Sequence, residues 1–316
     1  MLFRTPQDIV SAYECGLLGW QYNKATMERL FADGKATTFG AACPHLRGIG
    51  DKALALLWKS REKYDPGAFG LEAQVRGSCV SHGSRNCRDT TRSVEIDIKG
   101  EAEEYYKRGA TEPTYGARGS RGEGMDPAVA TRFEVDTGFL FREKYPFADL
   151  SKLNEWICDN WLRGMPAEMI AECKKHHVGR YVAPGDIAEA KALFAAGYAC
   201  HSGQQFGVQA SSDARGLAVR GKSWNHDMAT IGMDDTKQVY PCCVFLVANS
   251  WGKWNNKPRV WPDELYGPWP VGSFLLSEEM WAQYFLRSRS MFFYCDVVGI
   301  PAKKLPNYGT PSDVLG

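Results

Sequence analysis

A cysteine, a histidine and an asparagine occur in this chain in an order and in local contexts that restrict its possible folds more than any other feature. Cys79 lies in a Gly-Ser-Cys-Val stretch, His226 in Trp-Asn-His-Asp, and Asn249 opens Asn-Ser-Trp-Gly. A cysteine attacks a carbonyl carbon as its thiolate, so it needs a base, and a third polar group can orient that base. Because the three residues are far apart in sequence, a fold that uses them must bring distant parts of the chain together.

Local patterns give each residue of this set a chemical role. A helix is predicted over residues 79–95, because small and apolar residues recur there at steps of three and four. Cys79 would then begin a helix, where the positive end of the helix dipole lowers the pKa of a thiol. His226 would act as the base and later as the acid that protonates the leaving amine, and Asn249 would orient its ring. Gln74 and the backbone N–H of Cys79 could donate hydrogen bonds to the developing oxyanion.

Each of these residues also has an ordinary structural explanation. A cysteine that begins a helix is most often a small buried hydrophobic residue, a histidine in a strand can simply be hydrogen-bonded, and an asparagine often forms a turn. These explanations are favoured for each residue alone, whereas the order, spacing and context of all three together favour catalysis. Trp251, in the same motif as Asn249, is expected to cover the contact between Asn249 and His226 and to keep water away.

The composition limits the classes of partner. The chain has 316 residues, 44% of them hydrophobic, with 38 basic and 37 acidic side chains, a formal net charge of +1. This balance gives no reason to expect a nucleic acid or an anionic membrane as partner. No apolar run is long enough to span a membrane, and the first residues lack the apolar core of a secretory signal. A peptide or protein substrate is therefore expected, with no nucleic-acid or membrane partner.

The cysteines indicate a reducing compartment. Ten cysteines are scattered over the chain without the density of a disulfide-stabilised secreted protein, so mostly buried free thiols are expected. Zinc is a weak alternative, because Cys43 with His45, and Cys79 with His82 and Cys87, contain ligand types but no paired Cys-x-x-Cys units. We expect no metal and no cofactor, and a location in the cytoplasm or inside a virion or other assembly.

The first half of the chain is predicted to be mainly helical and the second half mainly strands, which predicts an α+β architecture of two lobes. Residues 111–126 are expected to form a loop. Further helices are predicted over 26–32, 52–64, 101–108, 127–134, 149–163, 166–175, 187–196 and 278–287, and strands over 198–209, 226–233, 239–249 and 290–298.

Several motifs resemble those of the papain-like cysteine peptidases. Gln74 with the Gly-Ser-Cys stretch resembles the oxyanion glutamine and nucleophile segment of that family, and Asn-Ser-Trp-Gly at 249–252 matches its asparagine motif. Gly-Glu-Gly-Met at 122–125 is similar to its glycine-rich substrate-binding loop. The resemblance runs from about residue 66 to about residue 300. It implies a two-lobe α+β fold, in which a helical lobe and a β-rich, barrel-like lobe enclose the active-site cleft.

The same resemblance implies how a substrate would bind. An extended peptide would cross the cleft and form backbone hydrogen bonds with Gly122 and Gly124. Met125 and the stretch 198–205 would line the pocket for the side chain two places before the cut, and Trp251 is grouped with these substrate-binding residues. The implied divisions are an N-terminal extension on the core (1–66), the lobe with the nucleophile (67–197), the lobe with the histidine and asparagine (198–300) and a tail (301–316).

The sequence is compatible with three candidate functions. The first is a cysteine endopeptidase that works through a Cys79–His226–Asn249 thiolate mechanism with an acyl-enzyme intermediate. The alternative is a papain-like structural or binding subunit of a larger assembly, such as a virus particle, with weak or no peptidase activity. A third class is acyl transfer or amide hydrolysis on a substrate other than a protein. There the third residue is commonly an aspartate, so Asn249 favours the peptidase.

Two departures from the family are that Gln74 lies one residue nearer the nucleophile than usual and that Val80 replaces an aromatic residue.

Overall fold

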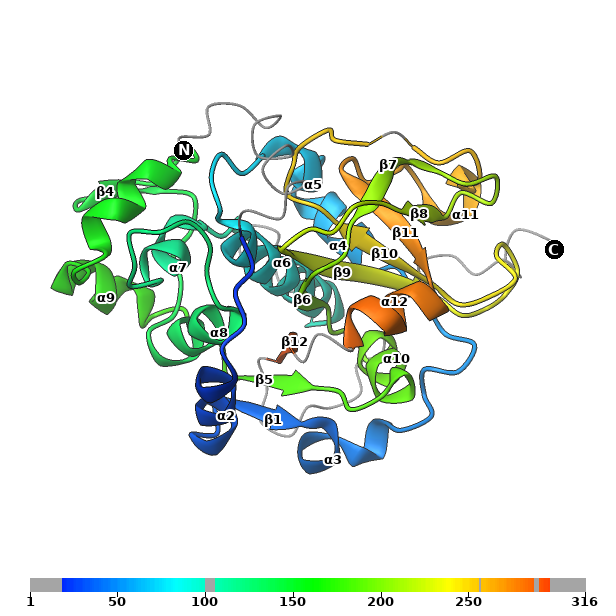
Figure 1. Ribbon diagram of the computed structural model, residues 1–316, viewed down its shortest axis with the longest axis horizontal. Coiled ribbons are helices and arrows are strands. Elements are labelled where there is room, and N and C mark those ends of the chain that lie inside the picture. Colours follow the sequence, from blue (N-terminus) through cyan, green and yellow to red (C-terminus); the bar gives the residue numbers. More distant parts are fainter. Residues whose placement is uncertain (1–18, 100–105, 256, 287–289, 296–316) are drawn as a thin grey trace.

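A long central helix divides the molecule into a helical side and a strand-rich side (Figure 1). The computed structural model describes residues 19–99, 106–255, 257–286 and 290–295. The central helix, α6 (Cys79–Lys99), contains the predicted helix and extends beyond it. It packs against the strands on one side and against shorter helices on the other. The fold is therefore α+β, with a helical lobe and a β-rich lobe, as the sequence predicts.

The remaining helices are short, and side-chain caps begin several of them. Asp126, Asp186 and Ser277 accept hydrogen bonds from backbone N–H groups of the first turns that follow them. The helices are α2 (Lys24–Ala32), α3 (Phe39–Ala42), α4 (Leu57–Tyr64), α5 (Ala68–Leu71), α7 (Glu112–Gly116), α8 (Pro127–Asp136), α9 (Ala167–Cys173), α10 (Ile187–Ala195), α11 (Asp263–Tyr266) and α12 (Glu278–Tyr284), with 3-10 turns at Pro44–Leu46 and Glu155–Trp161.

One eight-stranded sheet forms the framework of the strand-rich side. Its order is β1-β5-β12-β6-β9-β10-β11, with β2 paired to β9. The β1–β5 pair is parallel and the other pairs are antiparallel. This order is open, so the described strands do not close into a barrel. The strands are β1 (Ala36–Thr38), β2 (Leu54–Ala55), β5 (Arg180–Ala183), β6 (Cys200–Gln204), β9 (His226–Asp234), β10 (Val244–Ala248), β11 (Ser273–Ser277) and β12 (Met291–Cys295).

Two small hairpins lie apart from this sheet, β3 (Lys144–Tyr145) with β4 (Ala148–Asp149) and β7 (Val208–Ser212) with β8 (Ala218–Arg220). Strands β1 and β2 come from the predicted N-terminal extension, yet both join the large sheet. Strand β5, from the predicted helical lobe, joins it too. The sheet therefore combines segments from three of the predicted divisions, whose boundaries stay predictions.

Some predicted elements differ in the structure. The helix expected over 149–163 is wrong, because only Glu155–Trp161 is helical and it forms a 3-10 turn. The cause lies in its polar side chains: Glu155 turns inward to bind other segments instead of facing solvent. The strand expected from residue 239 begins only at Val244, after Pro241, which has no N–H for a strand ladder. The loop over 111–126 contains α7, and most of the helix expected over 101–108 lies outside the described residues.

Strand β9 is an interior strand of the sheet, paired with β6, β10 and β2, and is buried along its whole length. Helix α6 packs against β9 and β6. Gly83, one turn into α6, makes this contact close, since a Cβ atom there would lie 2.0 Å from Oδ1 of Asp227. The absence of a side chain at Gly83 therefore lets the first turn of the helix approach the start of the strand.

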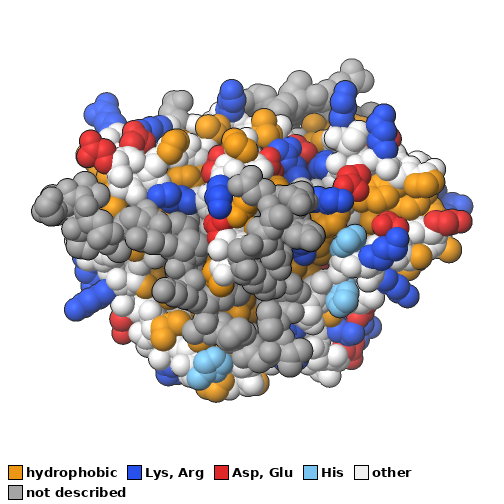
Figure 2. Space-filling model, turned by 180° about the vertical axis from the view of Figure 1, so that it is seen from behind, with side chains coloured by type: hydrophobic (Ala, Val, Ile, Leu, Met, Phe, Trp, Pro, Cys, Tyr) orange, Lys and Arg blue, Asp and Glu red, His pale blue; other side chains and the backbone are white. Residues whose placement is uncertain are grey.

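The surface shows no dominant charge on the face seen in Figure 2, where basic and acidic side chains are interspersed. This mixture agrees with the net charge of +1. Within the described ranges, no helix is both long and apolar enough to cross a membrane.

Candidate active site

His226 and Asn249 meet where neighbouring strands end. His226 is the first residue of β9, and Asn249 directly follows β10. Nε2 of His226 lies 2.8 Å from Oδ1 of Asn249. The same Oδ1 accepts a bond from the N–H of Ser250, 2.7 Å away, which identifies it as an oxygen. Nε2 is then the donor, so in the neutral imidazole Nδ1 is the nitrogen that can accept a proton.

Tryptophan rings enclose this pair. The ring of Trp251 stacks on His226 with centroids 4.7 Å apart and an angle of 24° between the planes. Trp224 packs edge-on against both rings, with centroids 4.7 Å from Trp251 and 6.1 Å from His226. His226 and Asn249 are fully buried. Because the rings exclude water, the hydrogen bond between the two side chains is stronger than it would be in solvent.

Cys79 is the first residue of α6, on the same helical face as Gly83 four residues later. Its side chain is fully buried. The carbonyl of Ser78 accepts from the N–H of His82 at 3.2 Å, so the helix begins directly after Ser78. Since Gly83 brings this turn against Asp227, the residue next to His226, the structure places Cys79 and His226 in the same part of the interface between helix and sheet.

Gln74 links the turn before the nucleophile to the asparagine motif. Its Nε2 donates to the carbonyl of Arg76 at 2.9 Å, and its backbone N–H donates to the carbonyl of Ser250 at 2.8 Å. Its Oε1 accepts from the hydroxyl of Ser250. The glutamine is thus held between the two predicted catalytic segments, and its role as oxyanion donor stays a prediction.

Two carboxylates that the sequence did not single out hold this turn, the half-buried Glu123 and the fully buried Glu155. Glu123 accepts from the N–H of Gly77 at 2.7 Å and pairs with Arg76 at 2.7 Å. Glu155 accepts from the N–H of Val75 at 2.7 Å. Glu123 lies inside the Gly-Glu-Gly-Met motif, which is a usable sequence signal, whereas Glu155 stands in a stretch that reads as an ordinary amphipathic helix.

The predicted substrate-binding loop is bonded to the chain's own N-terminal segment. Met125 donates from its N–H to the carbonyl of Gly19 at 2.9 Å and accepts from the N–H of Gln21 at 3.1 Å. The N–H of Trp20, between them, donates to the carbonyl of Asn225 at 3.0 Å. Residues 19–21, in dark blue in Figure 1, therefore bridge this loop and the residue before His226. We call these three residues the strap.

The side chain of Trp20 occupies space beside the predicted histidine. A Cβ atom on Gly203 would lie 1.8 Å from Cδ1 of Trp20, so the indole is seated directly over the glycine backbone. Gly203 pairs with Asp227 across the β6–β9 ladder, one residue from His226. Gly203 belongs to the stretch 198–205 that was expected to line a substrate pocket. Of the predicted loop residues, Gly122 is exposed and Gly124 is buried near the carbonyl of Gly19.

Burial controls the charge of His226. Desolvation lowers its pKa from 6.5 to about 3, against the opposing effect of the bond to Asn249 and with a further lowering by the charge of His82. His226 is therefore a neutral imidazole at neutral pH in this arrangement. It can accept a proton, but the imidazolium that results needs more hydration than the closed site offers.

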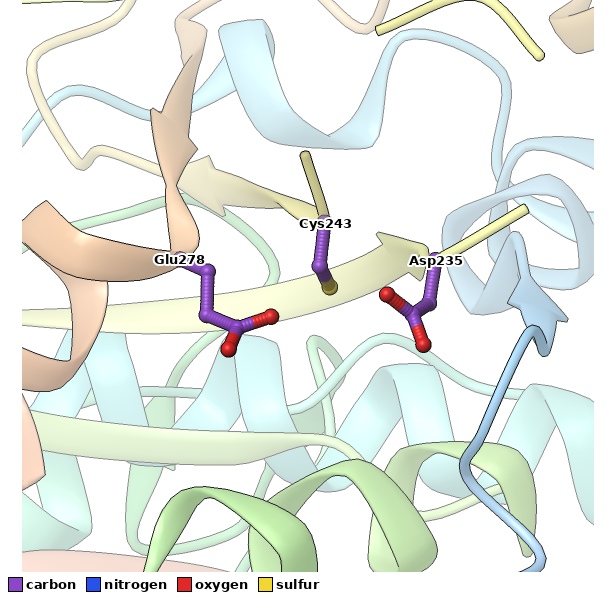
Figure 3. A group of neighbouring side chains, drawn as sticks. All are labelled: Asp235, Cys243 and Glu278. Carbon is purple, nitrogen blue, oxygen red and sulfur yellow. The ribbon is translucent and has the colours of Figure 1, made fainter. Parts of the chain in front are cut away.

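A cluster of possible metal ligands lies elsewhere. Asp235, Cys243 and Glu278 offer ligand atoms within 4.8 Å of one another (Figure 3). Nζ of Lys191 lies 2.7 Å from Asp235 and 3.7 Å from Glu278, so a lysine ammonium already neutralises the carboxylates. Burial and the charge of Asp235 raise the pKa of Cys243 well above its usual range, which disfavours a thiolate ligand. We interpret the cluster as a structural ion-pair network.

Comparison with known proteins gives matches in structure but not in sequence. No protein-family model matches the chain, and no curated protein matches its sequence. Xylellain, a cysteine protease from Xylella fastidiosa, is 13% identical over 89% of this chain and 91% of its own, with a TM-score of 0.46. Procathepsin L 3 of the Tenebrio molitor larval midgut is 12% identical over 92% and 87%, with a TM-score of 0.47.

A third similar structure is the ragweed pollen allergen Amb a 11, a cysteine protease in its proform. It is 15% identical over 92% of this chain and 76% of its own, with a TM-score of 0.48. At these identities and TM-scores, the interpretation of the site rests on the contacts described above.

The depressed pKa of His226 predicts how stability depends on pH. The unfolded chain takes up the imidazole proton near pH 6.5, whereas the folded chain does so only near pH 3. The stabilising contribution is therefore complete above the unfolded value and is lost as pH falls toward the folded one. Urea unfolding at a series of pH values should show this decline in wild type and a shallower decline in His226→Gln. Equal declines in the two proteins, or an NMR titration of His226 near 6.5, would contradict the assignment.

Proposed function

We propose that the protein is a cysteine peptidase with Cys79 as nucleophile, His226 as base and Asn249 as the residue that orients the base. The observation that carries the proposal is the 2.8 Å bond between His226 and Asn249 beneath Trp251. It leaves Nδ1 of His226 as the proton acceptor, in the part of the interface where Cys79 begins α6. The proposed chemistry of Cys79 and His226 needs no metal or cofactor.

The proposed reaction forms and then hydrolyses a thioester. The Cys79 thiol gives its proton to Nδ1 of His226, and the sulfur attacks the peptide carbonyl carbon. The oxyanion that forms accepts bonds from the Cys79 N–H and the Gln74 amide. His226 then gives the proton to the leaving amine as the C–N bond breaks. In the second half, His226 takes a proton from water, the hydroxide attacks the thioester, and the acid product leaves as the Cys79 thiol is restored.

We also propose that the strap keeps the site latent in this conformation. It occupies the backbone groups of Met125, beside the Gly124 expected to bind an extended peptide, and Trp20 fills the space above Gly203. A substrate must therefore displace the strap, which is held here by three backbone hydrogen bonds, the bond from the Gln21 side chain to the carbonyl of Glu123, and the packing of one indole. Displacement would also let water reach His226 and raise its pKa toward the ordinary value.

The cellular setting is part of the same proposal. None of the nine cysteines within the described ranges is joined in a disulfide, which suits a reducing compartment. We propose a peptide or protein as the substrate and the cytoplasm, or the inside of a virion or other assembly, as the location. The alternative function, a structural subunit of such an assembly, needs no reactive Cys79 and is separated from the peptidase by the next experiment.

Substitution of the nucleophile tests the peptidase directly. Cleavage of a mixed fluorogenic peptide library under reducing conditions should fall at least about a thousandfold in Cys79→Ala, because nothing else in the site can form the acyl intermediate. Cys43→Ala is the matched control. Cys43 is equally buried and burial raises the pKa of its thiol to about 11, so its loss should leave cleavage intact. Equal activity in wild type and Cys79→Ala would refute the assignment, and absence of cleavage even after the strap is loosened would favour the structural role.

Loosening the strap should activate the site. Trp20→Ala removes the indole that is seated over Gly203, and we expect both cleavage and the alkylation of Cys79 by iodoacetamide to rise about tenfold or more, the equivalent of about 1.4 kcal/mol. Ile49→Ala is the control, because Ile49 is 41% exposed and lies outside the strap, whereas the ring of Tyr22 packs against Trp20. If Trp20→Ala reacts no faster than Ile49→Ala, the strap does not govern access to Cys79.

A further inference from the structure

One buried carboxylate binds several residues of the turn that precedes the nucleophile. Glu155 is fully buried at the start of the 3-10 turn Glu155–Trp161. One oxygen accepts from the N–H of Val75 at 2.7 Å. The other accepts from the hydroxyl of Ser78 and lies 2.9 Å from Nε2 of His82. Its three partners therefore lie on both sides of Cys79, although Glu155 itself is far away in sequence.

These bonds fix the geometry on which the proposed chemistry depends. Val75 follows Gln74, the proposed oxyanion donor, and Ser78 precedes Cys79, whose N–H is the second donor. A carboxylate that binds both residues sets the spacing between the two donors. That spacing is one residue shorter than is usual in the family that the motifs resemble. The turn is thus held by charge-assisted bonds, which are stronger than bonds between neutral groups.

The carboxylate of Glu155 is bound by a histidine of α6. His82 lies one helical turn after Cys79 and is fully buried, and its Nε2 lies 2.9 Å from Oε1 of Glu155. Arg76 reaches only the backbone carbonyl of Glu155, at 3.3 Å, and forms its ion pairs with Glu123 and Asp159 instead. Burial alone would raise the pKa of Glu155, but the bond to His82 and its charge lower the pKa below its usual value. Glu155 is therefore an ionised acceptor for the bond from His82.

His82 in turn acts on the groups around it. Its charge lowers the pKa of His226 on β9 and that of Glu72, which lies before the turn. Glu155 is the titratable group in direct contact with its ring.

We propose that Glu155 is a positioning residue for Cys79. It holds the Gln74–Cys79 turn through Val75 and Ser78, and it binds the ring of His82 one turn along the helix. This role rests on the proposed function of Cys79 as the nucleophile. It concerns residues that do not touch the substrate.

Two variants separate the two parts of this role. Glu155→Gln keeps one acceptor oxygen for the turn but removes the charge, so the charge-assisted bonds are lost. His82→Gln removes the imidazole and leaves the bonds that Glu155 accepts from Val75 and Ser78. In both variants Cys79 is held less firmly at the positive end of α6, so its thiolate is less favoured and the midpoint for alkylation should move to higher pH. We expect a loss of rate of roughly tenfold at neutral pH, equivalent to one unit in the midpoint.

The measurement is the pH profile of Cys79 alkylation by iodoacetamide, with modified residues identified by mass spectrometry, in the Trp20→Ala background. The matched control is Glu134→Gln. Like Glu155, Glu134 is fully buried and contacts a side chain of α6, since its Oε1 lies 2.9 Å from Nη1 of Arg88. Unlike Glu155, it makes no described bond to the turn before Cys79. Hydrogen exchange at the amides of residues 75–79, in an otherwise wild-type chain, supplies a second readout that does not depend on access to the thiol.

The outcomes are distinct. The proposal predicts faster exchange at residues 75–79 in Glu155→Gln, a raised alkylation midpoint in Glu155→Gln and His82→Gln, and neither change in Glu134→Gln. The double variant should shift the midpoint no further than Glu155→Gln alone, because the two residues act through one contact. A Glu155→Gln protein that behaves like Glu134→Gln in both readouts overturns the proposal. Peptide cleavage by the Trp20→Ala parent is scored separately, so failure of the proposed function is recognised on its own.

Discussion

The close contact between the first turn of α6 and the start of β9 is the constraint on which the site depends. Gly83 allows it, because any side chain at that position would overlap Asp227. The contact sets the start of the helix, with Cys79 and the positive end of its dipole, against the strand that begins at His226. The ladder between β9 and β10 then brings Asn249 to the histidine. One helix–strand contact and one strand pairing thus assemble residues from distant parts of the sequence.

Burial gives the site its chemical character and also its latency. Tryptophan rings, the strap and the surrounding core leave His226 without water, so its imidazole stays neutral. Charged groups nearby have partners, Glu155 in His82 and the buried Arg76 in Glu123, because an unpaired buried charge would cost several kcal/mol. The same dry surroundings would strengthen the hydrogen bonds that stabilise an oxyanion once a substrate replaces the strap. In the proposed mechanism, activation exchanges the strap for an extended substrate.

The sequence predicted the parts of this arrangement that local pattern determines. The helix that begins at Cys79, the strand that begins at His226 and the cap of Asp186 follow from periodicity and capping, and the structure confirms them. The same reasoning failed where polar side chains face inward. The stretch around Glu155 has the spacing of an amphipathic helix, but the Glu155 carboxylate binds a turn that is distant in sequence. Such a tertiary contact leaves no signal in the local pattern. The seating of Trp20 over Gly203 likewise depends on two residues whose proximity no local pattern records.

The central claim is that Cys79 carries the acyl group of the substrate. Its most direct test is rapid mixing of the Trp20→Ala protein with a peptide ester, followed by an acid quench and peptide mapping by mass spectrometry. The account predicts a transient adduct with the mass of the peptide acyl group on Cys79, formed before free acid accumulates and released by hydroxylamine. Hydrolysis of the ester without that adduct, or with the acyl group on another residue, would contradict it.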